Sequence, residues 1–289
     1  MKDFFKIFIE KLLNARIKLL FRVLKIAIKR KIAMQKDAVS PMLKKERQEF
    51  IIRQLNLHNK VLSTDLCQEL NVSEDTVRRD LTELSENNKI VKVHGGALSK
   101  SFYGSNDEAD IYEKSKKQII AQKAVDLIKD DMLILTSGGT TILEVIKLLP
   151  KTLKATFCTV SLVAAEELLK HPNIEVIFIG GKISKDARIC VGGDSILKIS
   201  EMIFDLCFIG TNGIDAKHGL TDSDLEVVQV KKAMLKASKK FIVLSISEKL
   251  DSIARATICQ PNEIDYLITE LSPDDEQVIA YRDAGVGLL

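Results

Sequence analysis

The sequence has few of the features that mark metal-binding, disulfide-bonded or exported proteins. Its cysteines are odd in number and scattered, with no C-x-x-C pair: Cys67, Cys158, Cys190, Cys207 and Cys259. None of the four histidines lies at a metal-ligand spacing from these cysteines. We therefore expect a reduced, cytoplasmic protein that holds no metal and no other cofactor.

Long apolar runs are also missing. No stretch reaches the roughly 18 apolar residues that a transmembrane helix needs, because lysines and arginines interrupt the hydrophobic N-terminal segment. That segment has no clear uninterrupted apolar centre followed by a small-residue cleavage site, as a secretory signal would have. The pattern excludes a membrane span there and argues against export.

Neither sign of charge dominates the whole chain, but the basic residues are concentrated in its N-terminal segment. The 289 residues hold 43 Lys and Arg against 40 Asp and Glu, a formal net charge of only +3, which does not indicate strong binding to nucleic acid. Residues 1–41 nevertheless hold 11 basic and 3 acidic residues, so the remainder has a net charge of −5. A chain of this length with 46% hydrophobic residues is typical of two globular domains.

Residues 1–41 have two interpretations. Apolar residues recur at helical intervals from Phe4 to Ile32, the pattern of a basic amphipathic helix on an anionic membrane surface or beside DNA. Alternatively, because Met34 and Met42 follow and a globular pattern begins at Met42, the extension is a misassigned start or a disordered tail. We favour the second interpretation and predict no firm membrane partner.

Three short helices are predicted after this extension. Residues 44–57 place apolar side chains among charged ones at helical spacing. A second helix is expected to have Ser63 as its N-cap and to end near Asn71, which can close a helix in the left-handed conformation. Ser73 is the expected N-cap of the third helix, and acidic residues in the next turn would complement the helix dipole.

The third helix has the composition of a DNA-recognition helix. Val77, Leu81 and Leu84 form an apolar stripe that leaves Arg78 and Arg79 outside it. Arginine forms bidentate hydrogen bonds to guanine or pairs with phosphates, so two arginines near a capped helix start suit the major groove. The DNA-binding residues predicted here and in the following segment are Ser73, Thr76, Arg78, Arg79, Lys92 and His94.

The segment after this helix predicts a wing. Residues 89–96 have an alternating, β-like pattern that ends in a glycine turn. The local charge adds little, since residues 42–100 hold 10 basic and 9 acidic residues. A bare helix-turn-helix pattern with this charge leaves open a purely structural role for the helices.

A longer motif in the same place resembles a known family. Residues 72–81, Val-Ser-Glu-Asp-Thr-Val-Arg-Arg-Asp-Leu, precede His-Gly-Gly-Ala at 94–97. This combination resembles the signature of DeoR-type bacterial transcriptional regulators. The resemblance covers about residues 42–289 and implies a winged helix-turn-helix, with double-stranded operator DNA as its partner, joined to a domain that senses sugar phosphates.

The rest of the chain predicts an α/β domain. Beyond a polar, turn-rich linker at 99–112, apolar strands alternate with helical segments, which is typical of a Rossmann-like, mostly parallel sheet covered on both faces. Strands are expected at 132–135, 155–159, 174–179, 206–209, 241–244 and 266–268. The expected organisation is an extension at 1–41, an α+β winged helix-turn-helix at 42–98, the linker at 99–112 and an α/β sensor at 113–289.

Loops of small polar residues follow several of these strands, where α/β sheets bind ligands. Residues 137–141, Ser-Gly-Gly-Thr-Thr, are the best candidate for phosphate capture, because glycines let backbone N–H groups approach an anion and a helix begins behind them. A tight turn needs small residues in any case, so a structural role stays open. The order of the loops is similar to that in the DeoR sensor domain, which is related in fold to ribose phosphate isomerase. By position, the resemblance implies effector contacts from Gly139, Thr140, Thr141, Ser161, Gly180, Gly181, Gly210, Gly213 and Lys249.

Three positions depart from the family pattern. Ser137 stands in place of a frequent Asp, Val160 in place of an Asn, and Ile246 in place of the Asp that precedes the family's lysine by three residues. The loss of these polar groups argues against general acid–base chemistry. Lys231 is a looser effector candidate, with a place on a solvated helix face as the alternative.

We therefore predict a sequence-specific DNA-binding regulator rather than an enzyme. The expected form is a repressor of carbohydrate metabolism genes, controlled by a phosphorylated sugar or a related metabolite. Because two recognition helices must meet two half-sites at a fixed spacing, we expect a homodimer or homotetramer. A sugar-phosphate isomerase-like enzyme with an accessory DNA-binding domain is the alternative.

Overall fold

The computed structural model describes residues 42–100 and 111–289, and the chain divides into two compact units, Met1–Gln48 and Glu49–Leu289. The basic extension predicted at 1–41 and most of the expected linker lie outside the described residues. Of the helices that the structure describes, none has the length and apolar character to cross a bilayer. All five cysteines are free thiols.

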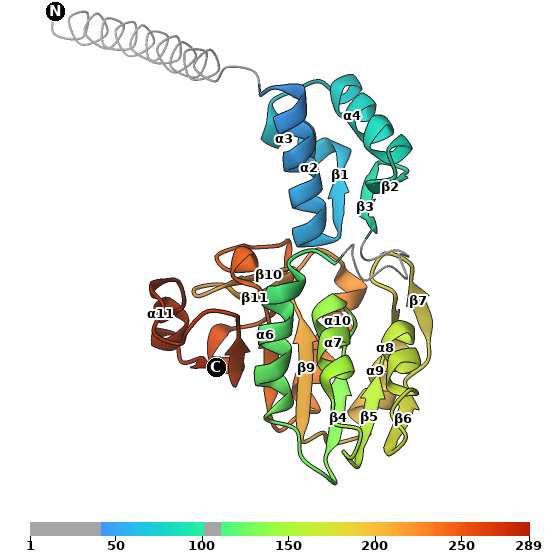
Figure 1. Cartoon of the computed structure of the whole chain (residues 1–289), viewed down its shortest axis with the longest axis vertical. Helices are drawn as coiled ribbons and strands as arrows, with labels where there is room; N and C mark the ends of the chain where they lie inside the picture. The colour runs from blue at the N-terminus through green and yellow to red at the C-terminus, as the bar shows by residue number, and fades with distance from the viewer. Residues whose placement is uncertain (1–41, 101–110) are drawn as a thin grey trace, which may run out of the picture. The chain divides into compact units, whose positions relative to one another are not determined.

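Three helices and a three-stranded antiparallel sheet form the winged helix-turn-helix (Figure 1). In chain order these elements are α2 (Lys44–His58), β1 (Lys60–Leu62), α3 (Ser63–Leu70), α4 (Glu74–Glu86), β2 (Ile90–Val93) and β3 (Gly96–Ser99). The strands lie in the order β1-β3-β2, and the β2–β3 hairpin is the wing. The three predicted helices and the wing are confirmed.

The core of the winged helix-turn-helix explains its helix boundaries. The predicted stripe of Val77, Leu81 and Leu84 is at most 2% exposed and belongs to a cluster of apolar side chains from all three helices. Asn71 ends α3 in the left-handed conformation with φ of 51°, as predicted. The N-cap prediction for Ser63 is wrong, because β1 runs directly into α3 and the Gly95 carbonyl accepts the Ser63 N–H at 2.8 Å.

A seven-stranded, fully parallel sheet forms the centre of the sensor (Figure 1). Its strands lie in the order β15-β14-β12-β9-β4-β5-β6, with bounds β4 (Leu133–Thr136), β5 (Ala155–Thr159), β6 (Ile174–Phe178), β9 (Leu206–Gly210), β12 (Phe241–Leu244), β14 (Tyr266–Ile268) and β15 (Gly287–Leu288). All six strands expected from the sequence are present, so the predicted α/β fold is confirmed. β15 was not predicted, because two residues give no periodic signal.

The connections between these strands are mostly helices. They comprise α6 (Lys114–Val125), α7 (Thr140–Leu148), α8 (Leu162–Leu168), α9 (Gly193–Ser200), α10 (Leu225–Lys236), α11 (Glu276–Asp283) and two 3-10 turns at Ser247–Lys249 and Pro261–Glu263. Short strands outside the main sheet pair as β7 (Lys182–Ser184) with β8 (Ile189–Val191), and β10 (Gly213–Asp215) and β13 (Ala256–Cys259) on either side of β11 (Gly219–Asp222).

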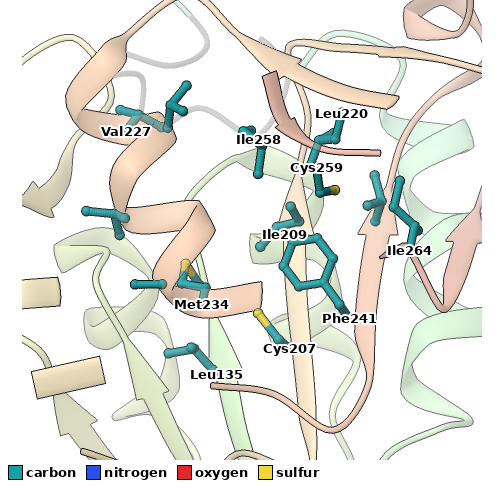
Figure 2. Packing of buried hydrophobic residues seen from close by; sticks show 14 of the residues in the cluster. Leu135, Cys207, Ile209, Leu220, Val227, Met234, Phe241, Ile258, Cys259 and Ile264 are labelled. Carbon is teal, nitrogen blue, oxygen red and sulfur yellow. The ribbon is translucent and has the colours of Figure 1, made fainter. Parts of the chain in front are cut away.

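Alternating side chains in the strands create a core on each face of the sheet. Ile134 and Phe208 point to the face that α6, α7 and α8 cover, whereas Leu135 and Cys207 point to the face of α9, α10 and α11. Figure 2 shows the second core, where Val227 and Met234 of α10 pack with side chains of the sheet. With helices on both faces, the carboxyl ends of the strands are left for a ligand.

Gly96 provides a test of how tightly the wing is built. A Cβ added there would lie 2.0 Å from the Val61 carbonyl oxygen in the neighbouring strand, so Gly96→Ala must push β1 and β3 apart. We expect the free energy of unfolding, measured by urea denaturation, to fall by about 1–3 kcal/mol.

Gly95→Asn is the matched control, because no atom lies within 4 Å of a Cβ at Gly95 and Asn tolerates its φ of 76°. A loss for Gly96→Ala no greater than the loss for Gly95→Asn would contradict the predicted steric conflict.

Candidate functional site

The start of α4 is fixed by its cap. The Ser73 side chain accepts the Thr76 N–H at 3.3 Å, and the two hydroxyls lie 2.9 Å apart. The predicted N-cap is therefore confirmed, and a cap of this kind contributes about 1 kcal/mol. Both side chains serve the cap in the DNA-free protein. The cap matters for function because it determines which turn of α4 presents the arginines.

The exposed face of α4 gathers three of the predicted DNA-binding side chains. Arg78, Arg79 and Lys92 line one shallow surface hollow together with Thr82, Glu83 and Glu86. Arg78 pairs with Asp75 at 2.8 Å, but both side chains are about 70% exposed, so the pair contributes little stability and Arg78 can exchange it for a DNA group.

Lys92 brings the wing and the recognition helix together. Its ammonium donates to Thr82 Oγ1 at 2.6 Å, which ties β2 to α4. His94 is exposed in the turn of the wing, beside Gly95. The surface therefore combines cations of a helix and a hairpin, although Glu83 and Glu86 reduce its net charge.

A cavity lies at the carboxyl ends of β4, β9 and β12, and the sensor contributes two groups of residues to it. One is the predicted loop Ser137–Thr141, which leads into the first turn of α7. Gly139 adopts φ of 119°, a value that residues with a side chain rarely adopt. No side chain caps α7, so its N-terminal N–H groups are open to a ligand in the cavity.

Three lysines form the second group. Lys117 of α6, Lys231 of α10 and Lys249 all line the cavity. Burial lowers the pKa of Lys249 to about 7; repulsion from Lys117 and Lys231 adds to this effect, while Asp222 opposes it. Burial also lowers the pKa of Lys117 to about 8. The three lysines therefore place positive charge at the strand ends, where an anion could bind, although the cavity is also lined by Asp65, Glu69, Asp186, Asp224 and Glu226.

Lys231 belongs to a buried ion pair. Its ammonium lies 2.9 Å from Asp222 Oδ2 and donates to the Gly210 carbonyl at 3.2 Å, with the whole residue 6% exposed. Asp222 also accepts from the Asn212 side chain at 3.2 Å. A place for Lys231 on a solvated face, the alternative left by the sequence, is therefore wrong. Through these contacts the ion pair holds the end of β9 and the loop after it, which line the cavity.

The predicted effector residues separate into two sets. Gly139, Thr140, Thr141, Gly210 and Lys249 line the cavity, whereas Ser161, Gly180, Gly181 and Gly213 do not. Ser161 caps α8 by accepting the Ala164 N–H at 3.3 Å, and the Gly180 carbonyl accepts from Ser195 at 2.9 Å.

Close packing explains the other two glycines that lie away from the cavity. A Cβ at Gly181 would lie 2.3 Å from Ser195 Oγ, and one at Gly213 would lie 2.9 Å from the Ser252 carbonyl.

Sequence reasoning missed Lys117 and Asp222. Lys117 sits on a helix whose charged residues give no sign of which side chain is buried, and Asp222 ends a strand of four residues that had no periodic signal. Within residues 42–100 and 111–289, no cluster of three or more His, Cys, Asp or Glu side chains could hold a metal ion.

The Asp222–Lys231 pair makes a stability prediction. Asp222→Asn would leave the buried Lys231 ammonium without its counter-charge, so we expect a loss of about 3 kcal/mol in unfolding free energy at pH 7. Burial raises the pKa of Asp222, but Lys231 outweighs this effect and holds the pKa below its usual range. The Asp222 contribution is therefore present above about pH 4 and is lost as the pH falls below that value, so the deficit of the variant should shrink in acid.

Glu226→Gln is the matched control, since it breaks an exposed pair with Lys182 that should contribute less than about 1 kcal/mol. Equal losses in the two variants at pH 7, measured by chemical denaturation, would show that the buried pair has no special importance.

Two domain families match the chain. Residues 47–102 match the DeoR-like helix-turn-helix domain, and residues 112–271 match the DeoR C terminal sensor domain. The HTH-type transcriptional regulator GolR of Listeria innocua is 33% identical over 245 residues, 83% of this chain and 96% of the relative. The HTH-type transcriptional repressor GlcR of Bacillus subtilis is 34% identical over 257 residues, 86% of this chain and 96% of the relative.

Among solved structures, ribose 5-phosphate isomerase A from Methanocaldococcus jannaschii aligns with 48% of this chain and 55% of that chain, at 20% identity and a TM-score of 0.37. A similarity this low carries no argument about activity. Both domain matches agree with the observed helix-turn-helix, wing and parallel-sheet sensor. The chain therefore belongs to the DeoR family of helix-turn-helix transcriptional regulators.

Proposed function

We propose that this protein is a repressor of carbohydrate metabolism genes whose sensor binds a phosphorylated sugar or a related metabolite without transforming it. It binds operator DNA through α4 and the wing as a homodimer or homotetramer, so that two recognition helices meet two half-sites. The name of the Bacillus subtilis relative, a transcriptional repressor, supports the direction of control.

The observation that carries the proposal is the meeting of two anion-binding features in one cavity. The Ser137–Thr141 loop offers backbone N–H groups and two threonine hydroxyls at the uncapped start of α7, and three lysines line the same cavity. A phosphate bound against the loop would lie where this positive charge supports it. The sugar would then extend toward the side chains at the ends of β9 and β12.

Control of DNA binding follows from linkage. An effector releases DNA only to the extent that it binds the DNA-incompetent arrangement more tightly than the DNA-bound one. Moving the population from 1:99 to 99:1 requires about 5.5 kcal/mol of differential affinity. Several charge-assisted hydrogen bonds between one phosphate and the cavity are enough to supply a difference of this size.

The recognition surface can be tested by arginine removal. Arg78→Ala or Arg79→Ala should lose about 1–3 kcal/mol of discrimination between operator and scrambled duplex if that side chain contacts a base. The measurement is fluorescence anisotropy with both duplexes at several salt concentrations, because phosphate contacts alone would lower both affinities together.

Arg282→Ala, which removes an arginine of α11 in the sensor, is the control and should bind both duplexes as the wild-type protein does. Unchanged discrimination in both α4 variants would remove this helix from the role of sequence recognition.

The cavity can be tested through Thr140. Thr140→Val removes a hydroxyl from the first turn of α7 at almost constant volume, so the affinity for a sugar phosphate should fall by about 1.5–3 kcal/mol. Operator affinity without effector should stay the same, because the change lies in the sensor. Both quantities come from titrating the operator complex with a panel of hexose and pentose phosphates.

Thr257→Val, at an exposed position of β13, is the control for the loss of a threonine hydroxyl. If Thr140→Val binds every active sugar phosphate as tightly as this control does, the phosphate-binding loop lies elsewhere.

A further inference from the structure

Lys117 has unusual partners for a buried lysine. The residue is 5% exposed, and its ammonium donates to the Tyr112 carbonyl at 2.5 Å and lies 5.9 Å from the centroid of the Tyr112 ring. Among the described residues, no carboxylate forms an ion pair with it. A charge that faces the cavity is thus held by a neutral carbonyl and an aromatic ring.

The shortage of counter-charge at Lys117 favours an incoming anion. Burial lowers the pKa of Lys117 to about 8, and the more distant charges of Glu144, Glu113 and Glu248 only partly oppose this. Hydrogen bonds from an ammonium to an anion are roughly twice as strong as those to a neutral acceptor. A phosphate in the cavity would therefore compete with the Tyr112 carbonyl for this ammonium.

The turn that Lys117 holds is strained. Glu113, between Tyr112 and the start of α6, adopts the left-handed conformation with φ of 50° and ψ of 44°, and no side chain caps the helix. A residue other than glycine keeps this conformation only where its surroundings enforce it. The contact from Lys117 to Tyr112 spans Glu113 and provides that support.

We propose that Lys117 is the switch of the sensor: an anion in the cavity draws its ammonium away from Tyr112, and the turn at residues 111–113 relaxes. The chain enters the sensor through this turn, because the expected linker ends at residue 112. Effector binding thereby loosens the turn at which the described part of the sensor begins. The inference rests on the proposed function, since it requires an anionic effector in this cavity.

An indole introduced by Tyr112→Trp is the reporter, because the chain contains no other tryptophan and an indole keeps the ring contact with the ammonium. The full-length variant is titrated with inorganic phosphate, glucose 6-phosphate and fructose 1-phosphate. We expect a saturable change in indole emission with at least one probe. In unmutated protein, the same probe should speed amide hydrogen exchange at residues 112–117.

Lys117→Gln tests the cation itself. By calorimetry, its affinity for the active probe should fall about tenfold or more, and the emission change should disappear when it is combined with Tyr112→Trp. Lys117→Arg, which keeps the charge, should retain much of the binding. Lys123→Gln is the matched control, because it removes a lysine of the same helix whose ammonium donates instead to the carbonyls of Thr269 and Leu271.

The outcomes separate this inference from the proposed function. If a sugar phosphate binds wild-type protein and Lys117→Gln equally well, the switch is refuted while the effector proposal stands. Weaker binding by Lys117→Gln without any change in emission or hydrogen exchange also refutes the switch, because Lys117 would then only hold the ligand. If no phosphate compound binds wild-type protein, the effector proposal fails and the switch fails with it.

Discussion

The buried ion pair between Lys231 and Asp222 is the constraint on which the sensor site depends. It anchors the loop after β9 through the Gly210 carbonyl and places one neutralised lysine beside Lys117 and Lys249, which donate to the carbonyls of Tyr112 and Thr211 instead of a carboxylate. If Asp222 were absent, three ammonium groups would repel one another across the cavity. With it, one of the three lysines has its charge compensated inside the protein, and the other two remain able to pair with an anionic ligand.

The two halves of the site hold a ligand in different ways. The loop before α7 offers fixed backbone donors, whose directions follow from the strand end and the helix axis, and these donors suit the geometry of a phosphate. Lys117 and Lys249 offer point charges that can serve many anions. In the proposed regulator, the loop would supply selectivity for phosphate, and the lysines would supply the differential affinity that shifts the DNA-binding equilibrium.

The DNA-binding surface depends on local interactions to a much greater degree than the sensor site does. The Ser73 cap, the left-handed Asn71 and the Val77 stripe are all encoded within a few residues of one another, and together they set the direction of α4. Its arginines are exposed because the stripe beside them is buried. The modest net charge of the surface is consistent with the proposed mechanism, in which the protein releases DNA when an effector binds.

Local sequence determined the helix-turn-helix, the wing and six of the seven strands of the main sheet, because caps, glycine turns and apolar runs act over a few residues. It also indicated the candidate phosphate-binding loop at residues 137–141, since small residues between a strand and a helix give a local signal. Only the tertiary structure decided that Lys117, Lys231 and Asp222 meet at one edge of the sheet, whereas Ser161 caps α8 and Gly181 packs against Ser195. The side chains that meet come from elements far apart in the chain, and their burial is set by strand order, which no local pattern encodes.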